Sequence, residues 1–551
     1  MRRLIYWTAI AALLSAAPLS AADGPLVPDP IFDVPALTST PLHARTLERS
    51  EHDGIVTEQV RFHSETDGDK QVEIFAFLSY PQGARAFPAY IWNPGGLGQA
   101  SPAYTELGAR RGYVVLCIDF PQPGYRSTGD YPINSGLFVG DDPRQAPIYH
   151  GAVALLKAVS FLISRPEVDP ERIGMAGSSW GGFFTTLMAG IDSRLKVAAC
   201  LYGTGGLHLG NAWWDGPSSN GREPPTPAER ERWRQTLDPA WRLPTKRTPI
   251  AWFTGTNDVF YLMPAVMHSY ERAAGPRHLM LLPNWDHALP ATLHDELIFS
   301  WLDAYLQDAT PPPAVSPVTV SHEESRITAC WDFDGDAVSA DLIVSYGATG
   351  NWRGRYWQSI PATIDGHSCR AEIPAARYPC FISGAVVDKR GHRSSTPLLL
   401  VDPASFGVVT EVRVPDYDGC SEWGGFEETQ IAFLARHTQS GQTRWVPDVS
   451  ADAYAGRASA VVQPGTTLLP PILSTALAPH QFRCRLKADA PTEIVLQIAD
   501  KQARAKIGTE WTEVVIEHTP PATIIGDIPA TITTPPDSVV LIDAVSFHPL
   551  H

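Results

Sequence analysis

The hydrophobic pattern of the first 310 residues alternates between two kinds of segment. Short, continuous apolar runs at residues 87–92, 113–119 and 248–255 are typical of strands buried on both faces of a sheet. Segments with helical periodicity, such as 152–164 and 294–306, lie between and after them. This alternation predicts the α/β class, with a mostly parallel sheet covered by helices.

The pattern changes after residue 310. The run Thr310-Pro311-Pro312-Pro313 interrupts it and is typical of a linker. From 314 to 402, and again from 405 to 551, short strand-like segments are separated by turn signals. We therefore predict an α/β domain over residues 23–310, followed by two all-β domains over 314–402 and 405–551.

The N-terminus has the pattern of an export signal. Arg2 and Arg3 precede an apolar run over residues 4–19, and small residues follow at 20–22. This predicts a signal peptide over residues 1–22 and a secreted or periplasmic protein. A membrane anchor is the alternative, which a short run broken by Pro18 disfavours.

Charge and cysteine content narrow the function classes. The 551 residues contain 43 Lys and Arg against 59 Asp and Glu, a net charge of −16. Such a surface repels nucleic-acid phosphates and anionic lipids, so we expect neither as a partner. The seven cysteines show no spacing typical of a zinc site, and no metal is expected. A disulfide among Cys330, Cys369 and Cys380 would suit an exported protein.

The strongest motif is Gly177-Ser178-Ser179-Trp180-Gly181, which matches G-x-S-x-G. A predicted strand over 173–176 precedes it and a predicted helix over 183–189 follows it. In that context the motif is a nucleophile elbow, a sharp turn that exposes the serine hydroxyl above the sheet. We predict Ser179 as the nucleophile. The alternative, a glycine-rich turn without a catalytic role, explains the strand and helix around it less well.

A nucleophilic serine needs a base, and the base needs a carboxylate that orients it. Asp258 follows the strand that ends near residue 255, and His287 follows the strand over 279–283. Their order matches the serine, acid, histidine order of the motif's fold. Asp286 adjoins His287 too closely for good orienting geometry. Other histidines fit less well. His268 falls in a predicted helix, His278 enters a predicted strand and His294 starts the last predicted helix. His150 precedes Ser179, which is the wrong order.

Two backbone N–H groups should bind the oxyanion that forms during acyl transfer. One is the amide of Trp180, directly after the nucleophile. The second should come from the glycine-containing loop over 93–98, and we favour Gly95 or Gly96.

These motifs, with the lead-in over 165–174, resemble the α/β-hydrolase superfamily, and within it the acetyl xylan esterase and dienelactone hydrolase branch. The segments 255–261 and 283–287 are also similar to PhoPQ-activated pathogenicity-related hydrolases. The resemblance covers about residues 50–308. It implies a doubly wound sheet, a Ser179–Asp258–His287 triad, and hydrolysis of esters or amides without a metal or cofactor. Asn93 departs from the pattern, since many relatives have histidine there.

The two β domains also carry resemblances. Residues 314–402 resemble a fibronectin type III-like sandwich, and residues 405–551 a galactose-binding-like jelly roll, on the segments 511–514 and 540–547. The second resemblance implies contact with polysaccharide, with Trp423 and Trp445 as candidate sugar platforms. Packing in a core is the alternative role for both tryptophans.

The segment over 202–247 is long and aromatic, and we expect it to cover the active site. Tyr202, Trp213 and Trp214 are candidates to line a substrate pocket or stack on a sugar ring. Aromatic packing under a long loop is the alternative.

The leading hypothesis is a secreted serine carboxylesterase that deacetylates carbohydrate or another small ester. Two alternatives remain. One is a secreted serine peptidase of the prolyl oligopeptidase type, and the other is a catalytically silent protein that binds carbohydrate.

Overall fold

The structure is a computed structural model. The residues that it describes are 29–83, 85–96, 98–133, 137, 140–215, 223–346, 352, 357–376, 379–406, 425–426, 445–469, 472–473, 480–518, 527–528 and 530–549. The predicted signal peptide and Trp423 lie outside the described residues. None of the helices in these ranges is long and apolar enough to cross a membrane.

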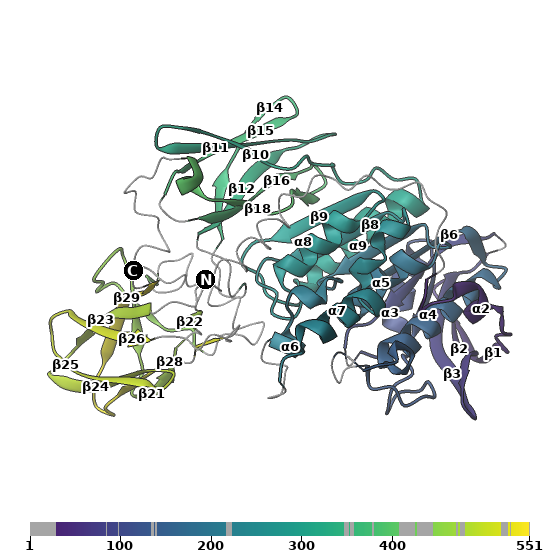
Figure 1. The fold of residues 1–551 in the computed structure, drawn as a ribbon, viewed down its shortest axis with the longest axis horizontal. Coiled ribbons are helices and arrows are strands. Elements are labelled where there is room, and N and C mark those ends of the chain that lie inside the picture. The colour runs from purple at the N-terminus through teal and green to yellow at the C-terminus, as the bar shows by residue number, and fades with distance from the viewer. Residues whose placement is uncertain are drawn as a thin grey trace.

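A nine-stranded sheet forms the centre of the first domain (Figure 1). Its strands are β1 (Arg45–His52), β2 (Ile55–Asp67), β3 (Lys70–Pro81), β4 (Phe87–Asn93), β5 (Val114–Ile118), β6 (Val168–Ser178), β7 (Val197–Leu201), β8 (Ile250–Gly255) and β9 (Arg277–Leu282). They are arranged in the order β1-β2-β3-β5-β4-β6-β7-β8-β9. The pairs from β5 to β9 are parallel, and the pairs from β1 to β5 are antiparallel. The predicted α/β class with a mostly parallel sheet is confirmed.

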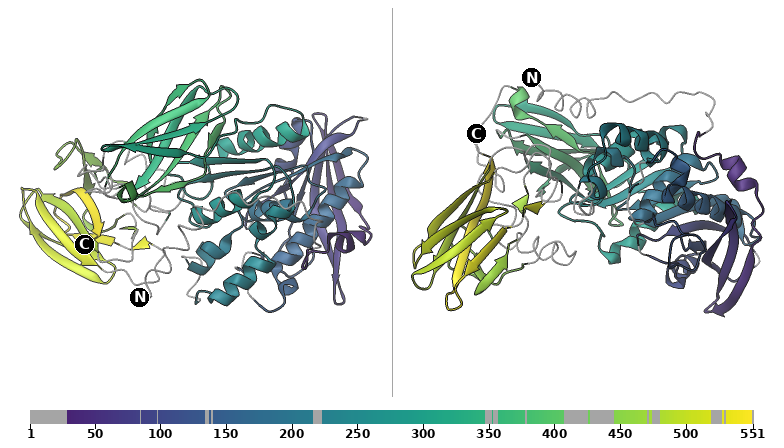
Figure 2. Two further views of the ribbon diagram at one scale, coloured as in Figure 1. Left: turned by 45° about the horizontal axis from the view of Figure 1, so that its top comes forward. Right: turned by 60° about the horizontal axis from the view of Figure 1, so that its bottom comes forward.

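Helices cover both faces of this sheet (Figures 1 and 2). On one face, α3 (Pro102–Arg110) and α9 (Ala291–Leu306) share a core with the central strands. On the other, α4 (Pro147–Ile163), α5 (Trp180–Ile191) and α8 (Met263–Arg272) pack against it. The long α4 is apolar on nearly all sides because the sheet, α5 and α2 (Val34–Ser39) surround it.

Residues 202–249, which we call the cap, connect β7 to β8. The cap contains α6 (Ala212–Asp215) and α7 (Pro227–Thr236), together with short 3-10 turns. Helix α7 begins with a capping box, in which the Thr226 and Glu229 side chains each bind the other's backbone N–H.

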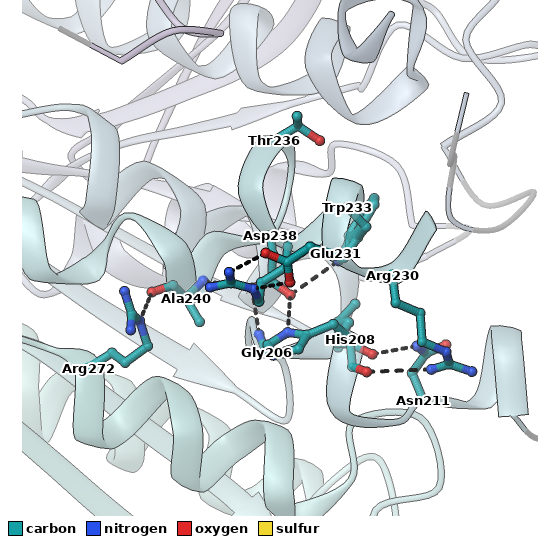
Figure 3. A network of polar contacts seen from close by, with 12 residues as sticks. Gly206, His208, Asn211, Arg230, Glu231, Trp233, Thr236, Asp238, Ala240 and Arg272 are labelled. Atoms are coloured by element: carbon teal, nitrogen blue, oxygen red, sulfur yellow. Dashed lines mark hydrogen bonds and ion pairs between the residues drawn. The ribbon is translucent and has the colours of Figure 1, made fainter. Parts of the chain in front are cut away.

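A buried carboxylate joins the parts of the cap (Figure 3). Asp238 accepts hydrogen bonds from the backbone N–H groups of Gly206 at 2.7 Å and Ala240 at 2.9 Å, and from the Trp233 indole at 3.1 Å. Burial opposes the charge of Asp238, but these N–H groups and the nearby His208 lower its pKa overall. The cap therefore depends on one ionised side chain that binds three of its segments.

Two features of the sheet differ from the sequence-based expectation. The edge strand β1 was not predicted, because its eight residues are all exposed and show no apolar pattern. It forms by antiparallel pairing with β2. Strand β6 begins earlier than predicted because Val168 pairs with Phe87 of β4, ahead of an irregularity in register.

The first all-β region forms two antiparallel sheets around a shared core. One sheet contains β10 (Thr319–Glu323), β11 (Arg326–Asp332), β15 (Ser368–Pro374) and β14 (Thr363–Asp365). The other contains β13 (Gln358–Pro361), β12 (Ser339–Tyr346), β16 (Cys380–Val387), β17 (Arg393–Ser395) and β18 (Leu399–Val401). Cys330 and Cys369 are both free thiols, so the suggested disulfide among the three middle cysteines is not formed.

The last region has a core of its own, from residues between 426 and 545. One sheet holds β19 (Val449–Ser450), β20 (Ser459–Val462), β29 (Val540–Pro549), β23 (His480–Ala488) and β26 (Thr512–His518). A second holds β21 (Gly465–Leu468), β28 (Ala530–Thr534), β24 (Thr492–Ile498) and β25 (Lys501–Ile507), while β22 (Ile472–Leu473) pairs with β27 (Asp527–Ile528). Trp445 packs against this core beside Phe426, which is the packing role rather than that of a platform. The fibronectin-like and jelly-roll assignments stay predictions.

Candidate active site

Ser179 lies in the turn between β6 and α5, at the carboxyl end of a central strand. Its φ of 54° and ψ of −120° place it in a strained region that a non-glycine residue rarely adopts. The turn is possible only because Gly181 lacks a side chain: a Cβ there would lie 2.0 Å from the Asn93 carbonyl oxygen. The elbow, residues 177–182, is therefore held by close backbone packing against β4.

His287 and Asp258 approach Ser179 from the two loops that follow β9 and β8. His287 Nε2 lies 2.8 Å from Ser179 Oγ, and His287 Nδ1 lies 2.9 Å from Asp258 Oδ2. Asp258 is fully buried, and its other oxygen accepts the backbone N–H groups of Phe260 and Tyr261 at 2.8 and 3.0 Å. The structure thus brings the three residues chosen from the sequence into one hydrogen-bonded chain.

The neighbouring Asp286 has a different task. Its Oδ1 accepts the backbone N–H of Val259 at 3.1 Å and that of His287 at 2.6 Å. It therefore ties the acid loop, residues 256–261, to the histidine loop, residues 283–288. Gly255 allows the same close approach, since a Cβ there would lie 2.1 Å from the Trp285 carbonyl oxygen.

The oxyanion candidates are Trp180 and the glycines of the loop that follows β4. The Trp180 amide is the first of α5, where helical N–H groups have no partner within the helix and the helix dipole favours negative charge. Gly95 lies against the elbow, and a Cβ on it would be 3.2 Å from the Ser179 Cβ. Gly96 lies in an exposed turn. The structure therefore places Gly95 against the nucleophile.

With this geometry established, the comparison with protein families becomes informative. The model of the dienelactone hydrolase family matches residues 99–281. The sheet and its covering helices have the α/β-hydrolase fold, and this part of the chain is similar to the dienelactone hydrolase family. The match includes the elbow and the acid loop, and ends six residues before His287.

Individual proteins similar to the hydrolase domain include esterases. The acetyl esterase Axe7A of Xylanibacter ruminicola is 25% identical over 145 residues, which are 24% of this chain and 33% of that protein. The match thus spans about one third of the length of this curated relative. An acetyl xylan esterase from Paenibacillus sp. R4 aligns with a TM-score of 0.44 and 21% identity, over 54% of this chain and 99% of that one. Acetyl xylan esterase 1 from Thermoanaerobacterium sp. JW/SL YS485 aligns with a TM-score of 0.43 and 16% identity, over 49% of this chain and 91% of that one.

Aromatic side chains surround His287. The rings of Tyr202 and Phe260 each lie 4.8 Å from that of His287. Trp213 of the cap packs against Trp180 at 4.7 Å and Phe260 at 5.5 Å. These rings leave an apolar setting beside the nucleophile, in which electrostatic interactions with a reacting group are strengthened.

Not every predicted pocket residue reaches this site. Trp214 is buried in the cap, with its ring 5.6 Å from that of Trp233 and 5.1 Å from the Arg230 guanidinium carbon. It has the packing role, because successive helical residues of α6 point in different directions. Phe260 and Tyr261 were not proposed as pocket residues, although their position directly after Asp258 was the available signal.

Tyr261 is fully buried and carries a polar atom that the fold does not use. Its backbone N–H binds Asp258, and its ring lies 6.0 Å from that of His287. Its hydroxyl makes no hydrogen bond of normal geometry to the described residues. Burial and the Asp258 charge raise the pKa of Tyr261 well above its usual value, and the adjacent Ser179 hydroxyl opposes them. Tyr261 thus presents a neutral O–H donor next to the nucleophile.

The described part of the chain contains no group of three or more histidine, cysteine, aspartate or glutamate side chains placed to hold a metal ion. The chemistry that the described side chains offer is that of a serine hydrogen-bonded to histidine among aromatic rings.

Proposed function

We propose that this protein is a serine carboxylesterase that removes acetyl or similar short acyl groups from carbohydrate or another small ester. The hydrogen-bonded chain from Ser179 through His287 to Asp258 carries this proposal. Matches to the dienelactone hydrolase family and to an acetyl esterase support ester hydrolysis.

The geometry accounts for each step of acyl transfer. Ser179 Oγ attacks the ester carbonyl carbon while His287 Nε2 takes its proton, and Asp258 stabilises the resulting imidazolium. The carbonyl oxygen becomes an oxyanion that accepts the N–H of Trp180. His287 then protonates the leaving alcohol, which leaves an acyl-enzyme. Water activated by His287 attacks this ester, and Ser179 leaves with the returned proton.

The aromatic surroundings support a small acyl group and a leaving group with an apolar face. Sugar rings present such faces, and Trp213 offers a partly buried indole on the cap side of the nucleophile. The buried Tyr261 hydroxyl lies beside that of Ser179 and is the donor that we assign to an oxygen of the reacting group.

Labelling with a fluorophosphonate tests the proposal most directly. Wild-type protein should be labelled and should hydrolyse p-nitrophenyl acetate, and Ser179→Ala should lose both. Folded wild-type protein that takes up no label would favour a catalytically silent, carbohydrate-binding protein. A second comparison sets acetylated xylo-oligosaccharide against an aminoacyl amide, because the peptidase alternative requires cleavage of the amide.

Export and polysaccharide contact are further parts of the proposal. If residues 1–22 are a signal peptide, protein recovered outside the cytoplasm should begin at Asp23, as N-terminal sequencing would show. If the last β region holds polysaccharide, Ser179→Ala protein should sediment with insoluble xylan, and protein without residues 405–551 should not.

A further inference from the structure

The first β region shares a core with the hydrolase domain. Strand β9 is the edge of the nine-stranded sheet, and β17 lies alongside it. The backbone N–H of Leu281 in β9 donates to Ser395 Oγ at 3.1 Å. Apolar residues from both regions form one cluster around these strands, including Trp252, Leu281, Met267, Trp357, Phe381 and Leu398. This contact covers a strand edge that would otherwise expose unpaired backbone groups.

One contact in this interface reaches the histidine loop. The Asn284 side chain donates from Nδ2 to the Trp357 carbonyl oxygen at 2.8 Å. Its Oδ1 accepts the Trp357 backbone N–H at 2.7 Å. Asn284 lies three residues before His287. Trp357 lies 73 residues after Asn284. The amide and the peptide therefore form a two-point bridge between the regions.

The bridge is rigid at both ends. Asn284 is 7% exposed and Trp357 is 1% exposed, so water does not replace these hydrogen bonds easily. Asn284 also adopts a φ of 59°, which asparagine tolerates better than most residues. Trp357 is fixed in turn, because its ring belongs to the apolar cluster that the two regions share.

The same residue also contacts the acid loop. The backbone N–H of Asn284 donates to Thr256 Oγ1 at 2.9 Å, and that hydroxyl donates to Asn257 Oδ1 at 2.6 Å. Asn284 is thus the point where the histidine loop, the acid loop and the first β region meet. A displacement of about 1 Å at a catalytic group costs on the order of 100-fold in rate, so the anchoring of this loop has catalytic consequences.

We propose that the first β region holds His287 in place through the bridge between Asn284 and Trp357. Asn284 is a positioning residue: it contacts neither His287 nor Ser179 through its side chain in the hydrogen bonds described, and acts through the loop. This inference rests on the proposed function, because it concerns the base of that reaction.

Asn284→Gly removes the bridge while keeping a residue that accepts positive φ, so backbone strain does not confuse the result. In the full-length protein we expect kcat for p-nitrophenyl acetate to fall about 10- to 100-fold with KM within about twofold. Fluorophosphonate labelling of Ser179 should slow to a similar extent. Asn284→Asp tolerates the same φ but sets a carboxylate oxygen against the Trp357 carbonyl oxygen, so at neutral pH it should be no more active than Asn284→Gly.

Ser395→Ala is the matched control. It removes another buried hydrogen bond across the same interface, at β9 rather than in the histidine loop. We expect it to lower the thermal midpoint but to leave kcat within about twofold of wild type. Wild-type activity in Asn284→Gly, or an equal loss of kcat in Ser395→Ala, would overturn the proposal. If wild-type protein takes up no fluorophosphonate, the proposed function itself fails. Failure of the positioning role and failure of the proposed function are therefore distinguishable.

Discussion

The proposed nucleophile, Ser179, and its proposed base, His287, are held in place by different means. Ser179 sits in an elbow whose strand, turn and helix are continuous over residues 168–191, and which packs closely against β4 through Gly181. His287 sits in an irregular loop that is fixed by single hydrogen bonds to distant segments. Asp286 links it to Val259, and Asn284 links it to Thr256 and Trp357.

This difference shows that the histidine loop, unlike the elbow, depends on contacts with distant parts of the chain. The elbow needs its glycines and its neighbouring strand, and a short motif in the sequence records both. The histidine loop has no comparable motif, because backbone polar groups in a loop must find partners wherever the fold brings them. Substitutions in the two parts should therefore fail in different ways.

The largest expected effect separates the two aspartates beside His287. Asp258→Asn should lower kcat about 10⁴-fold, since it favours the wrong tautomer of His287. The equally isosteric Asp286→Asn keeps an oxygen for the Val259 and His287 amides, and should cost at most about tenfold. Steady-state kinetics on p-nitrophenyl acetate measures both. Equal losses would mean that Asp286 shares the orienting role.

Gly181→Ala tests the elbow itself. Its new Cβ would lie 2.0 Å from the Asn93 carbonyl oxygen, so α5 and β4 must separate. We expect the free energy of unfolding to fall by about 3 kcal/mol, with loss of labelling at Ser179. Gly83→Ala is the control, because its Cβ would meet only the Phe87 ring at 3.8 Å. Urea unfolding of both variants measures the difference, and a stable, labelled Gly181→Ala would refute the close-packing argument.

Tyr261→Phe should move stability and activity in opposite directions. Removing a buried hydroxyl without a partner should stabilise the fold by about 1 kcal/mol. If that hydroxyl serves the substrate, kcat/KM should fall about tenfold. Thermal unfolding and ester hydrolysis of one preparation provide both values. Unchanged kinetics would assign Tyr261 to orienting Asp258 through its backbone alone.

A pH dependence of stability, with no direct effect on the reaction, is expected near the acid loop, which continues into α8. Burial, and then the charge of His208, lower the pKa of His268 in α8 to about 4. At pH values between about 4 and about 6.5, His268 is protonated in the unfolded chain but not in the folded protein. Stability should therefore fall as pH drops from about 6.5 to about 4, by up to about 3 kcal/mol.

Urea midpoints at pH 7 and pH 5 measure this dependence, and His268→Gln should flatten it. The ionised Asp238 adds stability that is lost only at lower pH, as it protonates below its ordinary pKa. Equal pH dependence in the wild type and His268→Gln would place the acid-sensitive group elsewhere.

Much of the hydrolase domain was predictable because its signals are local. Helix α4 and the strands β4, β5 and β8 have apolar patterns that match their burial. The polar strand β1 has no such pattern and depends on pairing with β2. That Trp213 packs beside Phe260 while Trp214 packs against Trp233 also required the structure, since the two neighbouring tryptophans differ only in direction.

The sequence by itself determined the α/β class, the elbow at Ser179, and the order in which acid and base follow it. These depend on hydrophobic period and on residues that are close along the chain. The tertiary structure alone decided how His287 is held, that Tyr261 presents a free hydroxyl beside the nucleophile, and that Trp357 reaches the histidine loop. Such contacts join segments far apart in the chain, and no local pattern encodes the distance between their atoms.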